Sequence, residues 1–157
     1  MELIRARSVD QAPLRVLARA LVAEFGHLYP DWKVDAAIVE LSQDSGAGLP
    51  LHLVTMDDGV PLGVASIIAD DEVTGWDGRG WWLANVLVLP AHRGHGIGME
   101  LVDRAIKIAA IYGADDLHLV TDTADAWYLK QGWKKIGTGD VHGHPMIVMR
   151  LVLKPNS

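Results

Sequence analysis

The sequence predicts one mixed α/β domain over residues 1–157, an α+β arrangement around a mixed sheet. The chain is 50% hydrophobic and 22% charged over its 157 residues, which suits a single compact domain with a sizeable core. Short apolar, strand-like segments alternate with segments whose apolar residues recur every three or four positions, as on one helix face. The expected order is β-α-α-β-β-β-α-β-α-β-β, and no repeat, low-complexity tract or linker interrupts it.

The first third of the chain predicts one strand and two helices. Residues 2–7 read as a short strand, and Asp10 and Pro13 then supply helix start signals. Apolar side chains at three- and four-residue steps follow them along one helix face. A second, shorter apolar face covers 34–41, and the glycine- and proline-containing segment 45–50 ends it.

Three strands are expected next. The apolar segments 51–56 and 60–69 flank Asp57, Asp58 and Gly59, which together form a strong hairpin turn signal. Residues 81–89 are too apolar to alternate between a buried and a solvated face, so this strand is expected to be buried on much of both faces.

The remaining elements begin at a glycine-rich segment, residues 93–98, that leads into an amphipathic helix closing near Gly113. A strand on each side of this helix predicts a right-handed parallel crossover. The glycines and histidines between the last two strands suggest a tight connection. The elements expected after the helix are a strand at 117–121, a short helix at 124–131, and strands at 133–138 and 145–153.

The segment from Arg93 to Met99 combines an arginine with three alternate glycines, Gly94, Gly96 and Gly98, at a helix start. Glycines let main-chain N–H groups approach a ligand closely, and the unpaired donors at a helix N-terminus suit a phosphate or pyrophosphate. Arg93 adds a fixed positive charge. A nucleotide P-loop would need Lys where Met99 stands, and the dinucleotide fingerprint also fails, since it requires glycine or alanine there or glycine at position 101.

These residues resemble the GCN5-related N-acetyltransferase (GNAT) family, whose loop pattern is Arg/Gln-x-x-Gly-x-Gly/Ala. Here that pattern is Arg93-Gly94-His95-Gly96-Ile97-Gly98. A second motif of the family, Ala-x-x-x-Tyr-x-x-x-Gly-Phe/Trp, matches Ala124, Tyr128, Gly132 and Trp133. The resemblance implies the GNAT-like fold, with a central mixed sheet that is splayed at the cofactor cleft.

The resemblance also implies acetyl-CoA as co-substrate and assigns residues to it. Tyr128 would be the general acid, since a phenol with an ordinary pKa of about 10 stays protonated at neutral pH and can donate to a departing thiolate. Backbone groups of Val86, Leu87 and Val88 would pair with the pantetheine arm. The pyrophosphate would be held by main-chain N–H groups of Arg93, Gly94, His95, Gly96, Ile97 and Gly98.

The general base is the part of the pattern that this sequence does not match. Many family members carry a glutamate on the strand corresponding to 81–88, which here has no acidic residue, and many have Asn where Thr121 stands. Asp122 is the base assigned first. Residues 70–72, all acidic, and Glu24 remain open as alternatives.

Charge and composition exclude several other classes of function. The 14 Lys and Arg against 20 Asp and Glu give a net charge of -6, and the basic residues are scattered, so no nucleic-acid partner is expected. The absence of a signal-peptide pattern and of an apolar run long enough to span a bilayer predicts a cytoplasmic protein without a membrane partner. There is no cysteine, and neither close histidine pair has a third ligand at a regular spacing, so no metal is expected.

The function expected from this reading is acetyl-CoA-dependent N-acetylation of a primary amine on a small molecule or peptide, by direct transfer in a ternary complex. The alternative is a non-catalytic acyl-CoA-binding or regulatory module, motivated by the missing strand glutamate, and a third reading is a structural domain with a fortuitous glycine turn. Trp76, Trp81 and Trp82 could pack on substrate, in the core or in a homodimer interface.

Overall fold

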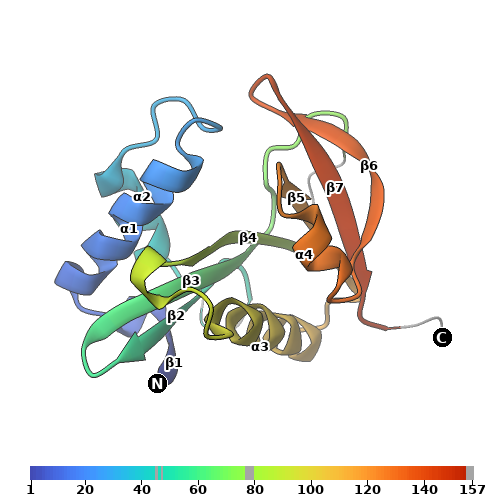
Figure 1. Ribbon diagram of the computed structural model, residues 1–157. Helices are drawn as coiled ribbons and strands as arrows, with labels where there is room; N and C mark the ends of the chain where they lie inside the picture. Colours follow the sequence, from blue (N-terminus) through green and yellow to red (C-terminus); the bar gives the residue numbers. More distant parts are fainter. Residues whose placement is uncertain (45, 47, 77–79, 155–157) are drawn as a thin grey trace.

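The computed structural model describes residues 1–44, 46, 48–76 and 80–154. Within them, a seven-stranded mixed sheet runs in the order β1-β2-β3-β4-β5-β7-β6, with helices packed against it (Figure 1). The elements are β1 (Glu2–Arg5), α1 (Gln11–Phe25), α2 (Val34–Ser42), β2 (Leu51–Asp57), β3 (Val60–Ile68), β4 (Trp82–Val88), α3 (Ile97–Ile111), β5 (Asp116–Thr121), α4 (Asp125–Leu129), β6 (Lys134–Val141) and β7 (His144–Val152).

The predicted fold class and the order of helices and strands are confirmed. The first strand is shorter than predicted, because a 3-10 turn over Ala6–Ser8 follows Arg5. The last hairpin is tighter than predicted. Residues 137–140 belong to β6, and the turn to β7 is His142 and Gly143, both with positive φ. Outside the described residues lie 45 and 47, in the predicted segment 45–50, and 77–79, between β3 and β4.

The two faces of the sheet are covered by different helices. In β2, Leu53 packs in a cluster with α3 residues, whereas its neighbour Val54 packs in a cluster with α1, as the alternation along a strand requires. The buried stripe of α1, including Leu14, Leu17 and Leu21, follows the predicted three- and four-residue steps. Among the described helices, none has the length and apolar content that a membrane crossing requires.

Strand β4 pairs unequally with its two neighbours. Its antiparallel pairing with β3 extends from Ile68↔Trp82 to Gly63↔Val88, with a register shift opposite Asn85. Its parallel pairing with β5 is a single position, Trp82↔His118. The edge of β4 that faces β5 is therefore unpaired over most of its length, and the functional site lies along it.

Candidate functional site

Three cavities follow one another along β4. The first, the β4 cleft, has a volume of about 580 Å³ and lies between β4 and the glycine loop. The second, the junction cavity, is about 250 Å³ and shares Glu24, Val86 and Ala124 with the β4 cleft. The third, the acidic cavity, is about 660 Å³ and shares four residues with the junction cavity: Tyr29, Asp71, Ala84 and Asn85.

The glycine loop at the β4 cleft has the backbone that its sequence predicts. Gly94 and Gly96 have φ of 85° and 79°, a region that L side chains rarely adopt, and Gly96 occupies the position before the first turn of α3. In the described part of the chain, the main-chain N–H groups of 94–99 donate to no protein acceptor. These unpaired donors at the positive end of a 15-residue helix form a suitable environment for an anion.

Most residues assigned to the cofactor from sequence line the β4 cleft. These are Val86, Leu87, Val88, Arg93, Gly94, Gly96, Ile97 and Gly98. Arg93 donates from Nε to the carbonyl of Val88 over 2.9 Å, which fixes the guanidinium beside the loop. His95 is not among the lining residues, and its Nδ1 lies 3.3 Å from the carbonyl oxygen of His92.

Sequence reasoning missed Trp127, which lines the β4 cleft from α4. A Cβ built on Gly98 would lie 3.5 Å from the indole of Trp127 and 3.5 Å from the side chain of Val88, which is ordinary contact. Glycine or alanine therefore fits at this position, as the family pattern allows. The sequence does contain an indication of this position, because Trp127 directly precedes the tyrosine of the second motif.

Tyr128 borders the junction cavity and is only 7% exposed. Its ring packs edge-on against Trp127 and Trp133, at centroid distances of 4.9 and 5.8 Å. Burial raises the pKa of the phenol above its ordinary value, so it is protonated at neutral pH. Thr121 accepts a hydrogen bond from the Ala124 N–H over 2.9 Å and so shapes the turn that leads to α4.

Two carboxylates named from sequence also border the junction cavity. Asp122 follows β5 and Glu24 lies on α1, and both side chains are exposed. Both therefore line the same cavity as Tyr128. A third carboxylate, Asp71, lines the same cavity and is buried.

Asn85 fixes the irregularity of β4 from which the cavities open. Its φ of 56° lies in the left-handed region, which asparagine tolerates better than most residues. Its Nδ2 donates to Ser66 Oγ on β3 over 3.2 Å, and the same hydroxyl lies 2.7 Å from Nδ1 of buried His52 on β2. Burial lowers the pKa of His52 to about 4, so its imidazole is neutral at pH 7. A chain of polar contacts thus ties the bulge to two neighbouring strands.

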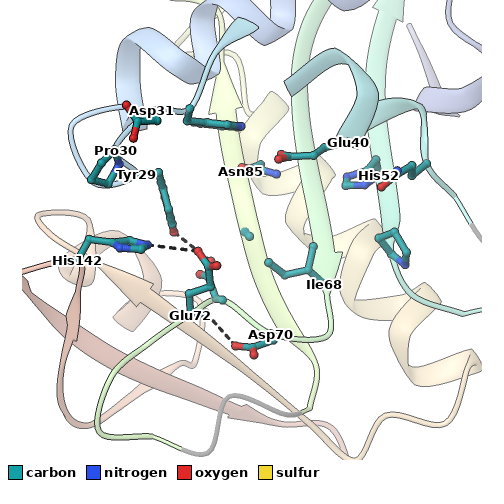
Figure 2. A pocket seen from close by; sticks show the side chains of 15 residues that line it. Tyr29, Pro30, Asp31, Glu40, His52, Ile68, Asp70, Glu72, Asn85 and His142 are labelled. Atoms are coloured by element: carbon teal, nitrogen blue, oxygen red, sulfur yellow. Dashed lines mark hydrogen bonds and ion pairs between the residues drawn. The ribbon is translucent and has the colours of Figure 1, made fainter. Parts of the chain in front are cut away.

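The acidic cavity collects carboxylates from three parts of the chain (Figure 2). In the part of the chain that the structure describes, no lysine or arginine lines it, whereas Tyr29, Trp32 and His142 contribute rings. Its carboxylates are Asp31, Glu40, Asp70, Asp71 and Glu72. The described residues contain no group of three potential ligands placed to share a metal ion.

Asp71 is the most unusual of these carboxylates, because its side chain is buried while it borders two cavities. The Tyr29 hydroxyl donates to its Oδ1 over 3.0 Å. Burial raises the pKa of the Asp71 carboxyl to about 7, the Tyr29 hydrogen bond opposes this rise, and the charges of Glu72 and Asp70 add to it. Glu72 itself lies 3.3 Å from Nε2 of His142 (Figure 2).

The loop that carries Asp71 is attached to β6. Thr74 and Asp140 exchange two main-chain hydrogen bonds of 2.8 and 3.3 Å, and the Trp76 indole donates to the carbonyl of Thr138 over 3.0 Å. Gly139 makes this close approach possible. A Cβ at that position would lie only 2.5 Å from the side chain of Val73 and 3.0 Å from the Trp76 ring. The glycines that suggested a tight turn from sequence thus form a platform for this loop.

Three tryptophans that could have contacted a substrate lie elsewhere. Trp82 is 1% exposed in the core, Trp81 packs against the α3 cluster, and Trp76 lies on β6. None of the three lines any of the three cavities described above. Trp82 therefore packs in the core, Trp81 and Trp76 pack partly buried against core clusters, and Trp32 is the indole in the acidic cavity.

Comparison with known proteins gives a family and a fold. Residues 15–133 match the model of the acetyltransferase (GNAT) family. Among curated protein sequences, none matches this chain. An aminoglycoside 6'-N-acetyltransferase complexed with coenzyme A superposes with a TM-score of 0.76 at 18% identity, covering 100% of this chain and 99% of the other.

Two further solved structures have similar agreement. The putative acetyltransferase yncA from Salmonella typhimurium, with its cofactor acetyl-CoA, has a TM-score of 0.70 at 20% identity and covers 100% of this chain and 96% of the other. A ribosomal-protein-alanine N-acetyltransferase from Brucella melitensis has a TM-score of 0.72 at 20% identity, with coverage of 98% and 100%. At these identities the three structures establish the similarity of fold.

Asn85→Ala should destabilise the protein more than Asn85→Gly. Both variants lose the contact with Ser66, but alanine must also adopt the positive φ that glycine adopts freely. The difference should be about 1–2 kcal/mol in the free energy of unfolding, measured by urea denaturation. Equal stability of the two variants would show that the backbone at this position relaxes.

Gly139→Ala should displace the loop that carries Asp71. Its methyl group overlaps Val73 and Trp76, and overpacking of this kind costs about 1–3 kcal/mol. Thr138→Ala is the matched control, because it shortens an exposed side chain and keeps the carbonyl that Trp76 uses. Trp76 fluorescence should change in Gly139→Ala and not in Thr138→Ala. The contribution of Trp76 is obtained by comparing each protein with the same protein carrying Trp76→Phe, in which the other tryptophans are unchanged. An unchanged spectrum would contradict the assigned packing.

Proposed function

Because the chain belongs to the GNAT acetyltransferase family, we propose that it transfers the acetyl group of acetyl-CoA directly to a primary amine, in a ternary complex. The family match covers residues 15–133 and so includes β4, the glycine loop and Tyr128. The observation that supports direct transfer best is the continuity of the three cavities. A donor in the β4 cleft and an acceptor in the acidic cavity would meet in the junction cavity, beside Tyr128.

The β4 cleft fits coenzyme A in two respects. The unpaired edge of β4 at Val86, Leu87 and Val88 offers main-chain groups to the amides of a pantetheine arm, as an added strand would use them. The free N–H groups of 94–99 and the guanidinium of Arg93 suit the pyrophosphate. Since the protein carries a net charge of -6 and coenzyme A is a polyanion, its binding depends on these local donors.

The acceptor is proposed to enter through the acidic cavity as a cation. The described residues that line that cavity include five carboxylates and no lysine or arginine, so their potential favours an ammonium group over a neutral or anionic acceptor. An amine with a pKa of about 10.4 is only roughly one part in a few thousand neutral at pH 7. The enzyme must therefore remove a proton before the nitrogen can attack the thioester carbonyl.

Tyr128 is proposed as the general acid for the departing thiolate. Its phenol is buried and protonated at the junction cavity, and no other protein group competes for its hydroxyl in the described hydrogen bonds. The hydrogen bond that it donates would stabilise the negative charge that develops on sulfur as the C–S bond breaks.

Gly96→Asp should abolish acetyl-CoA binding, because it places a negative charge where the pyrophosphate is expected. Gly96→Asn is the matched control, since asparagine has the same shape, tolerates the positive φ and carries no charge. Isothermal titration calorimetry should give the wild type a dissociation constant for acetyl-CoA well below about 1 mM. It should show weaker binding to the asparagine variant and no binding to the aspartate variant. Equal affinities of the two variants would exclude a phosphate at this loop.

The activity itself is tested by thiol release from acetyl-CoA over a panel of amines. The panel contains spermidine, an aminoglycoside such as kanamycin, and a peptide with a free N-terminal alanine, because relatives of this fold are named for the last two substrate types. Turnover with at least one amine is expected, and Tyr128→Phe should lower kcat by about 100-fold or more. Tight acetyl-CoA binding without turnover on any amine would instead support the non-catalytic module.

A further inference from the structure

We propose that Asp71, from the loop before β4, accepts the proton of the incoming amine, in place of the glutamate that β4 lacks and of Asp122. This assignment rests on the proposed acetyltransferase function and names the residue that the proposed mechanism requires. The position of Asp71 between two cavities is the first observation that supports it. Among the described residues, Asp71 is the only carboxylate that lines both the acidic cavity and the junction cavity. An amine that passes from one to the other must pass this side chain.

The surroundings of Asp71 suit a base better than those of its competitors. Its side chain is 8% exposed, and the Tyr29 hydroxyl holds Oδ1, which leaves Oδ2 without a hydrogen-bond partner among the described residues. Asp122 and Glu24 are exposed at the mouth of the junction cavity, where water solvates their charge. Proton transfer is most efficient when the pKa of the base lies near the working pH, and Asp71 meets this condition because it is buried.

Burial is the main cause of the raised pKa of Asp71, and the polar and charged groups around it adjust that pKa. Tyr29, which follows α1, donates to the ionised form and so favours it. Asp70 and Glu72 on the same loop carry negative charges, which disfavour the ionised form of Asp71. His142 from the β6–β7 turn contacts Glu72. Farther along the two cavities are Glu40 on α2, and Glu24 and His27 at the end of α1.

The proposed step balances as follows. The ammonium N–H bond breaks, and its proton passes to the Asp71 carboxylate, which leaves a neutral amine. The nitrogen lone pair forms the C–N bond at the thioester carbonyl, and the C–S bond then breaks with its electron pair going to sulfur. Sulfur gains a proton from Tyr128, and Tyr128 regains one from the nitrogen of the new amide. Asp71 finally releases its proton to solvent.

The test is the pH dependence of kcat/KM, measured by thiol release with the most active amine of the panel described above. The wild type should lose activity as pH falls through about 7, since a protonated Asp71 accepts no proton. Asp71→Asn should lower activity by about 100-fold or more. It should also abolish the loss of activity at low pH, which is the acidic limb of the pH profile. Asp58→Asn, in the exposed β2–β3 turn, is the matched control and should keep the wild-type profile.

Two neighbours should move the acidic limb in opposite directions. Tyr29→Phe removes the hydrogen bond to the ionised carboxylate, so the limb should shift to higher pH. Glu72→Gln removes a nearby negative charge, so the limb should shift to lower pH. Shifts in the same direction, or none, would overturn the assignment, as would Asp122→Asn abolishing the limb while Asp71→Asn keeps it.

The thermal stability of Asp71→Asn distinguishes the loss of a catalytic base from a failure to fold. The folded-state pKa of Asp71 lies above its unfolded value of about 3.9, so the ionised carboxylate destabilises the fold above pH 7. Asp71→Asn should therefore melt no lower than the wild type at pH 8, and it should still bind acetyl-CoA. If the wild type itself shows no turnover, the proposed function fails; if it turns over and Asp71→Asn does so with the same profile, only this inference fails.

Discussion

Strands β4 and β5 lie side by side in one sheet yet pair at a single position, Trp82 and His118. Past that point the backbone of β4 faces open space on one edge, and the three cavities are arranged along it. The backbone of β4 is irregular close to this parting. Asn85 adopts a positive φ, its side chain donates to Ser66 on β3, and the Ser66 hydroxyl contacts His52 on β2. These polar contacts fix the irregularity at a residue that lines both the acidic and the junction cavity.

The charged groups of the candidate site are divided between its two ends, as the two proposed substrates of opposite charge would require. As far as the structure describes them, the β4 cleft presents Arg93 and unpaired N–H groups, whereas the acidic cavity presents five carboxylates and no lysine or arginine. A uniform field of either sign would attract one substrate and repel the other. In the proposed function, the separation of these groups along β4 would let one small protein bind a polyanion and a cation at adjoining positions. Net charge alone describes neither end.

Much of this arrangement could be predicted from sequence, and the reasons differ by element. The glycine loop was visible because glycine at a positive φ, an arginine and a helix start leave a local pattern. The helices and most strands were visible through apolar periodicity. The burial of Asp71 was not, because it results from contacts with Tyr29 and β6 that are distant in the sequence. Likewise, Gly139 looked like a turn residue, since nothing local shows that Val73 and Trp76 pack on it.

The loop before β4 joins two parts of the molecule that the sheet itself scarcely connects. It begins and ends at β3 and β4, but Thr74 and Trp76 fasten its middle to β6, on the other side of the gap. The loop therefore connects the part of the sheet that contains β3 and β4 with the part that contains β5, β7 and β6 (Figure 1). Thr74 and Trp76 thereby tie the loop that carries Asp71 to the part of the sheet beside which Tyr128 lies. The relative position of these two groups, which line the same junction cavity, thus depends on this connection as well as on the sheet.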